Sequence, residues 1–141
     1  MRFWDTSALL PLFVAEKTSA RVRSWLRRDP TVLVWTLTRA EVLSALARRE
    51  REEPSAARAL LRARKRALAA WEEWSEIVAV EAVRRQAERL VSVHPLRAAD
   101  ALQLGAALVA TDLEPAGLAF VTLDERLATA AEKEGFSALG A

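Results

Sequence analysis

The chain has 141 residues, of which 52% are hydrophobic and 28% are charged, and its formal net charge is only +2. This size and composition predict one globular domain with a substantial core and exclude a disordered chain. The absence of cysteine excludes disulfides, zinc–thiolate sites and thiol nucleophiles, and the single histidine excludes a multi-histidine metal site. Any bound metal must therefore have oxygen ligands, which favours Mg²⁺ or Mn²⁺.

Short apolar segments alternate with longer helical patterns along the whole chain. The expected strands are Arg2–Trp4, Val32–Thr36, Ile77–Ala79, Leu118–Thr122 and Ser137–Leu139. The expected helices are Ser7–Val14, Ser19–Arg28, Arg39–Glu53, Pro54–Trp74, Val80–Val93, Leu96–Ala110 and Asp124–Glu134. This alternation predicts an α/β fold, with a parallel sheet covered on both faces, in a single domain over residues 1–141.

No apolar stretch approaches the ~20 residues that a membrane-spanning helix needs. Asp5 interrupts the apolar N-terminus, and no clear signal-peptide cleavage site follows it. We therefore expect a cytoplasmic protein without a membrane partner.

Four acids stand where an expected strand gives way to a helix, or near the start of a helix. They are Asp5, Glu41, Asp100 and Asp124. Ligands of open α/β sheets bind outside the carboxyl ends of the strands, so these positions favour one shared site. Two carboxylates ~4 Å apart repel each other by about 4 kcal/mol at an effective dielectric of about 20. We expect a fold that gathers such groups to do so in order to hold a divalent cation, with hydroxyls from Thr6, Ser7 and Thr122 orienting the carboxylates.

Each acid also has a structural explanation when it is taken alone. Asp5 and Asp124 could cap the helices that follow them. Thr38-Arg39-Ala40-Glu41 has the sequence of a capping box. Asp100 follows Arg97 by three residues, the spacing of an ion pair within a helix, although the helix around it is apolar nearly all round and should be buried. Four independent caps need not converge, whereas four metal ligands must.

A basic stretch without acids follows Pro54, in the longest expected helix. Its candidate RNA contacts are Arg58, Arg62, Lys65 and Arg66. The three arginines recur every four residues and therefore share one helix face. This strip favours the binding of phosphates, and a merely solvated helix face is the alternative interpretation.

Four segments of the chain together resemble the motifs of PIN-domain nucleases. They are Asp5-Thr6-Ser7-Ala8-Leu9-Leu10, Thr38-Arg39-Ala40-Glu41-Val42-Leu43-Ser44-Ala45-Leu46, Leu96-Arg97-Ala98-Ala99-Asp100-Ala101-Leu102-Gln103-Leu104 and Val121-Thr122-Leu123-Asp124-Glu125-Arg126-Leu127. The resemblance runs from Arg2 to about Leu139 and is weakest between Pro54 and Arg89. In its length and in the sequences of its motifs, the chain is most similar to VapC-type toxins of bacterial toxin–antitoxin pairs.

The resemblance implies a three-layer α/β/α fold around a parallel sheet of about five strands. It also implies a ribonuclease that hydrolyses RNA phosphodiesters with Mg²⁺ or Mn²⁺. The catalytic and metal-binding residues carried over are Asp5, Glu41, Asp100 and Asp124. Gln103 stands where relatives often have other polar residues. The implied partners are an RNA substrate, a second copy of the chain in a homodimer, and a cognate antitoxin that covers the active site.

Two other functions stay open at this stage. One is a non-catalytic RNA-binding module or PIN-like scaffold, which the complete acidic quartet disfavours. The other is a Mg²⁺-dependent phosphohydrolase with an aspartyl nucleophile. Such enzymes usually need a second acid two residues after the first, where this chain has Ser7.

Overall fold

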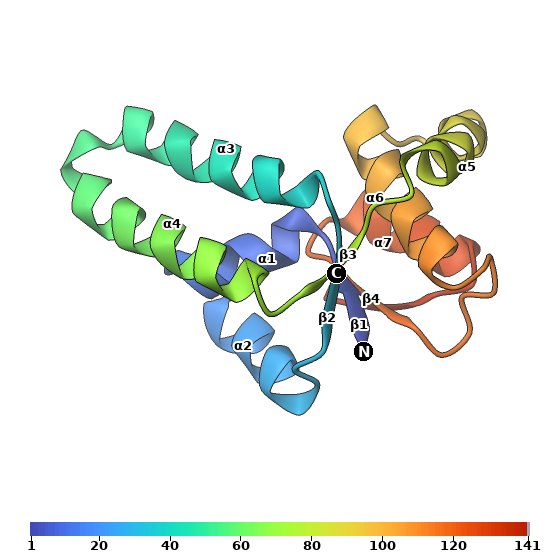
Figure 1. The fold of residues 1–141 in the computed structure, drawn as a ribbon, viewed down its shortest axis with the longest axis horizontal. Coiled ribbons are helices and arrows are strands. Elements are labelled where there is room, and N and C mark those ends of the chain that lie inside the picture. The colour runs from blue at the N-terminus through green and yellow to red at the C-terminus, as the bar shows by residue number, and fades with distance from the viewer. Residues whose placement is uncertain (141) are drawn as a thin grey trace.

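The computed structural model describes residues 1–140, and over these residues five parallel strands form one sheet between two layers of helices (Figure 1). The strands are β1 (Arg2–Trp4), β2 (Val32–Trp35), β3 (Ser75–Ile77), β4 (Ala119–Val121) and β5 (Ser137–Leu139). The helices are α1 (Thr6–Phe13), α2 (Ser19–Arg28), α3 (Thr38–Glu52), α4 (Ala57–Trp71), α5 (Val80–Val93), α6 (Ala98–Ala110) and α7 (Glu125–Lys133), with a 3₁₀ turn at Pro54–Ala56. This arrangement confirms the predicted α/β/α fold class.

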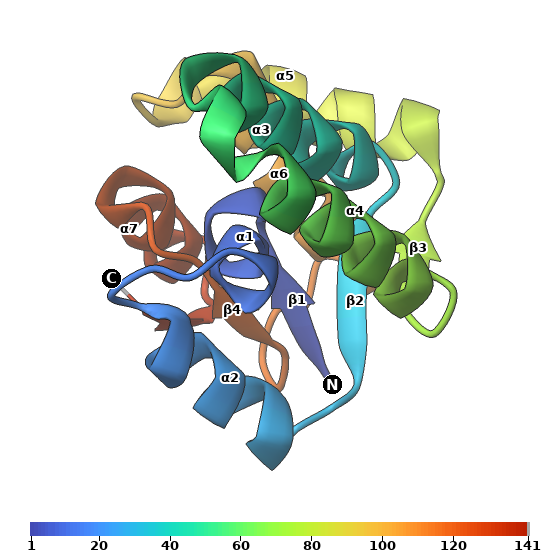
Figure 2. The same ribbon diagram turned by 90° about the vertical axis from the view of Figure 1, so that its left-hand side faces the viewer.

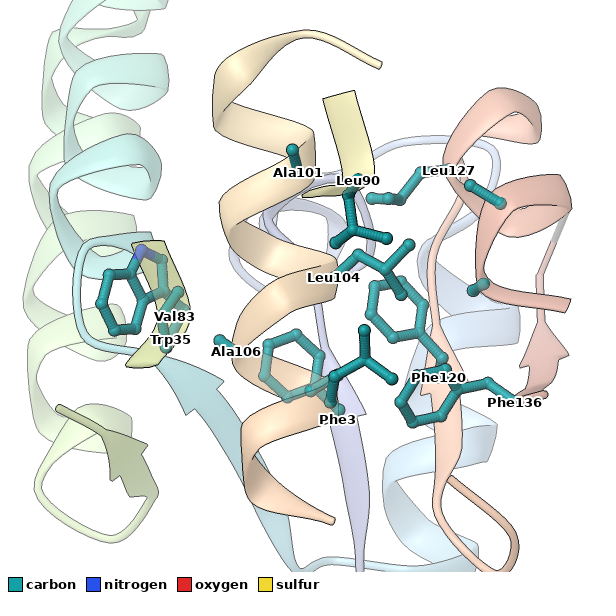
Figure 3. Packing of buried hydrophobic residues seen from close by; sticks show 14 of the residues in the cluster. Phe3, Trp35, Val83, Leu90, Ala101, Leu104, Ala106, Phe120, Leu127 and Phe136 are labelled. Atoms are coloured by element: carbon teal, nitrogen blue, oxygen red, sulfur yellow. The ribbon is translucent and has the colours of Figure 1, made fainter. Parts of the chain in front are cut away.

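Successive side chains of each strand point to opposite faces of the sheet, so the core consists of two clusters, one on each face. Phe3 and Phe120 stack with ring centroids 5.2 Å apart and pack with Leu104 of α6 beneath α5, α6 and α7 (Figure 3). Their neighbours Trp4 and Val121 point to the opposite face, into the cluster formed with α1, α2, α3 and α4. Figure 2 shows this second layer, in which α3 and α4 form a hairpin beside α1.

The two helices α5 and α6 approach each other closely at Gly105. A Cβ atom at this position would lie 3.0 Å from the carbonyl oxygen of Val83, so the helices pack closely where a side chain is missing. Within residues 1–140, none of the helices is long and apolar enough to cross a bilayer.

The order of the strands places a topological switch point between β1 and β4. The order is β3-β2-β1-β4-β5, so the chain leaves central β1 toward β2 on one side and later returns to β4 on the other. The backbone N–H of Asp5 donates to the carbonyl of Val121 over 3.1 Å, which aligns the ends of the two strands. In sheets of this kind the crevice at the switch point is the usual place for a ligand.

Several predicted boundaries were wrong by a few residues. The third strand was predicted at Ile77–Ala79 and lies at Ser75–Ile77, because this edge strand takes its register from pairing with Leu33–Trp35 of β2. The helix predicted from Pro54 to Trp74 is divided into the 3₁₀ turn and α4, and it ends at Trp71. Helix α6 begins at Ala98 and not at Leu96, because Arg97 has an extended backbone.

Candidate active site

Asp5 directly follows β1 and is almost completely buried, with 4% of its surface exposed. Its Oδ1 accepts a hydrogen bond from the Ser7 hydroxyl over 2.8 Å and one from the Ala8 backbone N–H over 3.3 Å, so Asp5 caps α1. Burial raises the pKa of Asp5 to about 7, although these hydrogen bonds act in the opposite direction. The carboxyl group is therefore close to its midpoint of ionisation at neutral pH.

Glu41 lies in the first turn of α3, one turn after the end of β2. Its Oε1 accepts from the side-chain amide of Gln103 over 3.1 Å, and its Oε2 accepts from the hydroxyl of Thr6 over 3.2 Å. Burial, with a further contribution from the charge of Asp100, raises the pKa of Glu41 above its ordinary value. The capping-box interpretation was wrong, because the Thr38 hydroxyl donates to Gln103 and Leu37 occupies the cap position.

Asp100 lies in the first turn of α6 and Asp124 caps α7. The predicted burial of this helix is found from Ala101 onward, whereas Asp100, in its first turn, is half-buried. Burial and then the charge of Asp124 raise the pKa of Asp100, while Arg97 and Arg126 act in the opposite direction. The Oδ1 of Asp124 accepts from the backbone N–H of Leu127 over 2.9 Å, so this acid also has the predicted cap role.

The structure brings three of the four acids around one open cavity of about 820 Å³. Glu41, Asp100 and Asp124 line it, together with the guanidinium-bearing side chains of Arg48, Arg97 and Arg126. Asp5 is not part of this lining. None of the salt bridges found within residues 1–140 involves any of the four acids. The cavity therefore has unpaired carboxylates beside arginines that could bind phosphate.

The hydroxyls of Ser7 and Thr122 connect Asp5 to the turn that carries Asp124. Ser7 donates its proton to Asp5, and the hydroxyl oxygens of Ser7 and Thr122 lie 3.3 Å apart. The Ser7 oxygen also accepts from the backbone N–H of Leu123 over 2.8 Å, and Thr122 accepts from the N–H of Asp124 over 3.1 Å. The adjacent Thr6 points to a different acid, Glu41.

Gln103 was undervalued by sequence reasoning, although it is fully buried among these groups. It contacts Thr6, Thr38 and Glu41, which are 97, 65 and 62 residues away in the chain. One local signal was available: Gln103 follows Asp100 by three residues, so it shares the face of an otherwise apolar helix with that acid.

The donor chemistry of the four acids suits a hard divalent cation, because every ligand is a carboxylate oxygen. In the described part of the chain, however, no three Asp, Glu or His side chains are placed to hold one ion together. Burial is the main cause of the raised pKa values of Glu41 and Asp100, and repulsion by Asp100 and by Asp124, respectively, adds to them. For Asp5, burial and not a neighbouring carboxylate raises the pKa.

The basic strip lies on α4, with the side chains of Arg58, Arg62, Lys65 and Arg66 exposed. Arg62 and Arg66 line a second cavity of about 930 Å³ between α1, α3 and α4, whereas Arg58 and Lys65 do not. Arg66 also donates to the carbonyl oxygen of Phe13 over 2.7 Å. Arg48 lines this cavity as well as the acidic one, so the two cavities adjoin at one arginine.

Comparison with curated proteins finds no match for this chain. A family model does match: the PIN domain model covers residues 2–133, a range that includes all four acids and the hydroxyls of Thr6, Ser7 and Thr122. PIN domains are generally nucleases, so nucleic acid is the substrate class of the family, and they often use divalent metals. Because the match extends over most of its length, the chain belongs to the PIN domain family.

Proposed function

We propose that this chain is a metal-dependent ribonuclease that hydrolyses phosphodiester bonds at the cavity lined by Glu41, Asp100 and Asp124. The observation that carries the proposal is the electrostatic state of these acids. They line one cavity, half-buried and without ion pairs. Burial raises the pKa of Asp100 and of Glu41, and the neighbouring charges of Asp124 and Asp100, respectively, add to these shifts. Such a set gains most from a bound cation, and the family is generally one of nucleases.

Asp100, Asp124 and Glu41 line the cavity and would hold Mg²⁺ or Mn²⁺, and the resemblance to PIN-domain nucleases adds Asp5, which lies outside this lining. A bound cation of this kind lowers the pKa of a coordinated water and neutralises charge on a phosphate group. Since no three of these side chains are already placed around one point in residues 1–140, we propose that side chains at the cavity must reorient to hold the ion. The burial of Asp5 and the hydrogen bonds to Glu41 restrict how far those two acids can move.

The arginines at the rim of the cavity supply the complementary charge for a polynucleotide. Three arginines line the acidic cavity: Arg48, Arg97 and Arg126. Arg48 also lines the second cavity, together with Arg62 and Arg66. Phosphates that flank the scissile bond are the natural ligands of this row. We propose that Arg62 and Arg66 contact the substrate, and that Arg58 and Lys65 add a more distant positive charge.

The resemblance to VapC-type toxins supports a narrower role for the same site. In this role the chain is the toxin of a toxin–antitoxin pair, acts on RNA in the cytoplasm, forms a homodimer, and is silenced by a cognate antitoxin. A short open reading frame directly upstream of its gene and a mass of two chains in multi-angle light scattering are the expected observations. A monomeric protein without such a neighbour would contradict this narrower role.

The test of the nuclease proposal is cleavage of total RNA by the purified protein, with and without Mn²⁺, followed by sequencing of the new 5′ ends. The unaltered chain should produce discrete new ends that require the metal. Asp5→Asn should produce none, whereas Asp112→Asn, at an exposed position after α6, should cut normally. Binding of RNA without cleavage under Mg²⁺ and Mn²⁺ would support the scaffold alternative. Accumulation of a covalent phosphoenzyme would instead support the aspartyl-phosphate alternative.

A further inference from the structure

The strongest unexplained feature of the site is a buried amide that joins the two helical layers. Gln103 belongs to α6 on one face of the sheet, and it reaches Thr6 of α1 and Thr38 of α3 on the other face. Only 2% of its surface is exposed, and Thr38 is completely buried. An apolar side chain would fill the same space without the cost of burying an amide, so packing alone does not explain Gln103.

The hydrogen bonds of this group have a single consistent direction. The Thr38 hydroxyl donates to the Gln103 Oε1 over 3.0 Å, which leaves both Nε2 protons facing the site. One of these protons goes to the Thr6 hydroxyl oxygen and the other to the Oε1 of Glu41, each over 3.1 Å. Thr6 in turn donates its own proton to the Oε2 of Glu41.

Both oxygens of the Glu41 carboxylate are therefore held by donors that are themselves fixed. Rotating the amide by half a turn would place its oxygen against the carboxylate, so Thr38 and Glu41 select the same orientation of Gln103. Every donor of the amide and of the Thr6 hydroxyl is used. A network without a spare donor permits only one arrangement of Glu41 at the edge of the cavity.

We propose that Gln103 is a positioning residue, oriented by Thr38, which holds the Glu41 carboxylate in the one orientation that serves RNA cleavage. The proposal rests on the proposed nuclease function. Gln103 does not line the cavity and so acts on the substrate only through Glu41. Removing a residue that orients a metal-binding side chain typically lowers activity roughly 10- to 100-fold.

The kinetic test uses Gln103→Met, which keeps the length of the side chain but removes its donors. The assay is Mn²⁺-dependent cleavage of a fluorescently labelled pool of randomised RNA oligonucleotides. The value of kcat should fall roughly 10- to 100-fold while KM changes little. Thr38→Val should lower kcat less, and should add nothing to Gln103→Met. Leu104→Met, at the next buried position of α6, is the matched control and should cleave normally.

The spectroscopic test reads the amide directly and needs no activity. The sequence contains two glutamines, Gln86 and Gln103, and no asparagine, so side-chain NH₂ groups give only two pairs of NMR signals. The two NH₂ protons of Gln103 should exchange slowly with water. Their chemical shifts should change in Glu41→Ala and in Thr38→Val. Gln86, which only accepts a hydrogen bond from Arg89, provides the internal reference and should not shift.

The outcomes separate the two proposals. Cleavage by the unaltered chain with an undiminished kcat in Gln103→Met would overturn the positioning role and leave the nuclease function standing. Absence of cleavage by the unaltered chain would overturn the nuclease function, and with it any role in cleavage. A Gln103 signal that exchanges rapidly and ignores Glu41→Ala would overturn the positioning role whatever the kinetics show.

Discussion

Replacing Asp5 with asparagine should stabilise the protein, and more so at alkaline than at acidic pH. The side chain is buried, and its pKa rises from 3.8 in the unfolded chain to about 7 in the folded one. The folded state therefore holds its proton between these pH values, while the unfolded chain has released it. Asp5 thus favours folding most at low pH, and this contribution is lost as pH rises from about 4 to about 7.

The size of the effect follows from the displacement of the pKa. A shift of about three units corresponds to about 4 kcal/mol of unfolding free energy once the carboxylate is ionised in both states. Integration gives a penalty that is about 2–3 kcal/mol larger at pH 8 than at pH 5. Asparagine has no such penalty, and its side-chain oxygen can still accept from Ser7 and Ala8.

Urea denaturation of the two proteins at pH 5 and pH 8, in buffer containing EDTA, measures this difference. The gain in unfolding free energy of Asp5→Asn over the unaltered chain should be about 2–3 kcal/mol larger at pH 8. Asp112→Asn corrects for the loss of one negative charge at an exposed site. An equal gain at both pH values would refute the conclusion that burial raises the pKa of Asp5.

Two further substitutions test the hydroxyl network and the arginine row. Ser7→Ala removes the donor to Asp5 and the acceptor of the Leu123 N–H, so the unfolding free energy should fall by about 1–3 kcal/mol in urea denaturation. Ser24→Ala in α2 removes only a solvent-exposed hydrogen bond to the carbonyl of Arg21 and should change it little, and equal losses would contradict a special role for Ser7. Arg62→Ala should weaken the binding of single-stranded RNA by Asp5→Asn protein, and it should reduce the salt slope of log K by roughly 0.7 in fluorescence anisotropy titrations. Arg58→Ala, whose side chain does not line the cavity, should have a smaller effect, and the reverse order would contradict the proposed path.

The fold could be predicted from the sequence because its pattern is local. Four elements, Arg2–Trp4, Ser19–Arg28, Val80–Val93 and Ser137–Leu139, have the predicted bounds, and periodicity and flanking residues were enough to set them. The edge strand β3 was misplaced because its first residues, Ser75 and Glu76, are polar. Glu76 accepts hydrogen bonds from Trp71 and Thr36, contacts that no local pattern reveals.

The site was harder to predict than the fold, since its parts belong to distant segments. The positions of the acids at strand ends were visible in the sequence, as were the cap roles of Asp5 and Asp124. The degree to which each acid is buried was not visible in the sequence. Asp5 is almost inaccessible, whereas Asp100 is half-buried. The link from Gln103 to Glu41 joins residues 62 positions apart, and only the tertiary fold brings them together.

In the proposed enzyme, the acids at the carboxyl edge of the sheet hold a divalent cation in common. The most direct test is a titration of the protein with Mn²⁺. Electron paramagnetic resonance detects binding as a loss of the free-ion signal. We predict saturable binding of one or two ions, which Asp100→Asn and Asp124→Asn each weaken strongly and Asp112→Asn leaves unchanged. Equal Mn²⁺ binding by all four proteins, or no binding at millimolar concentrations, would contradict it.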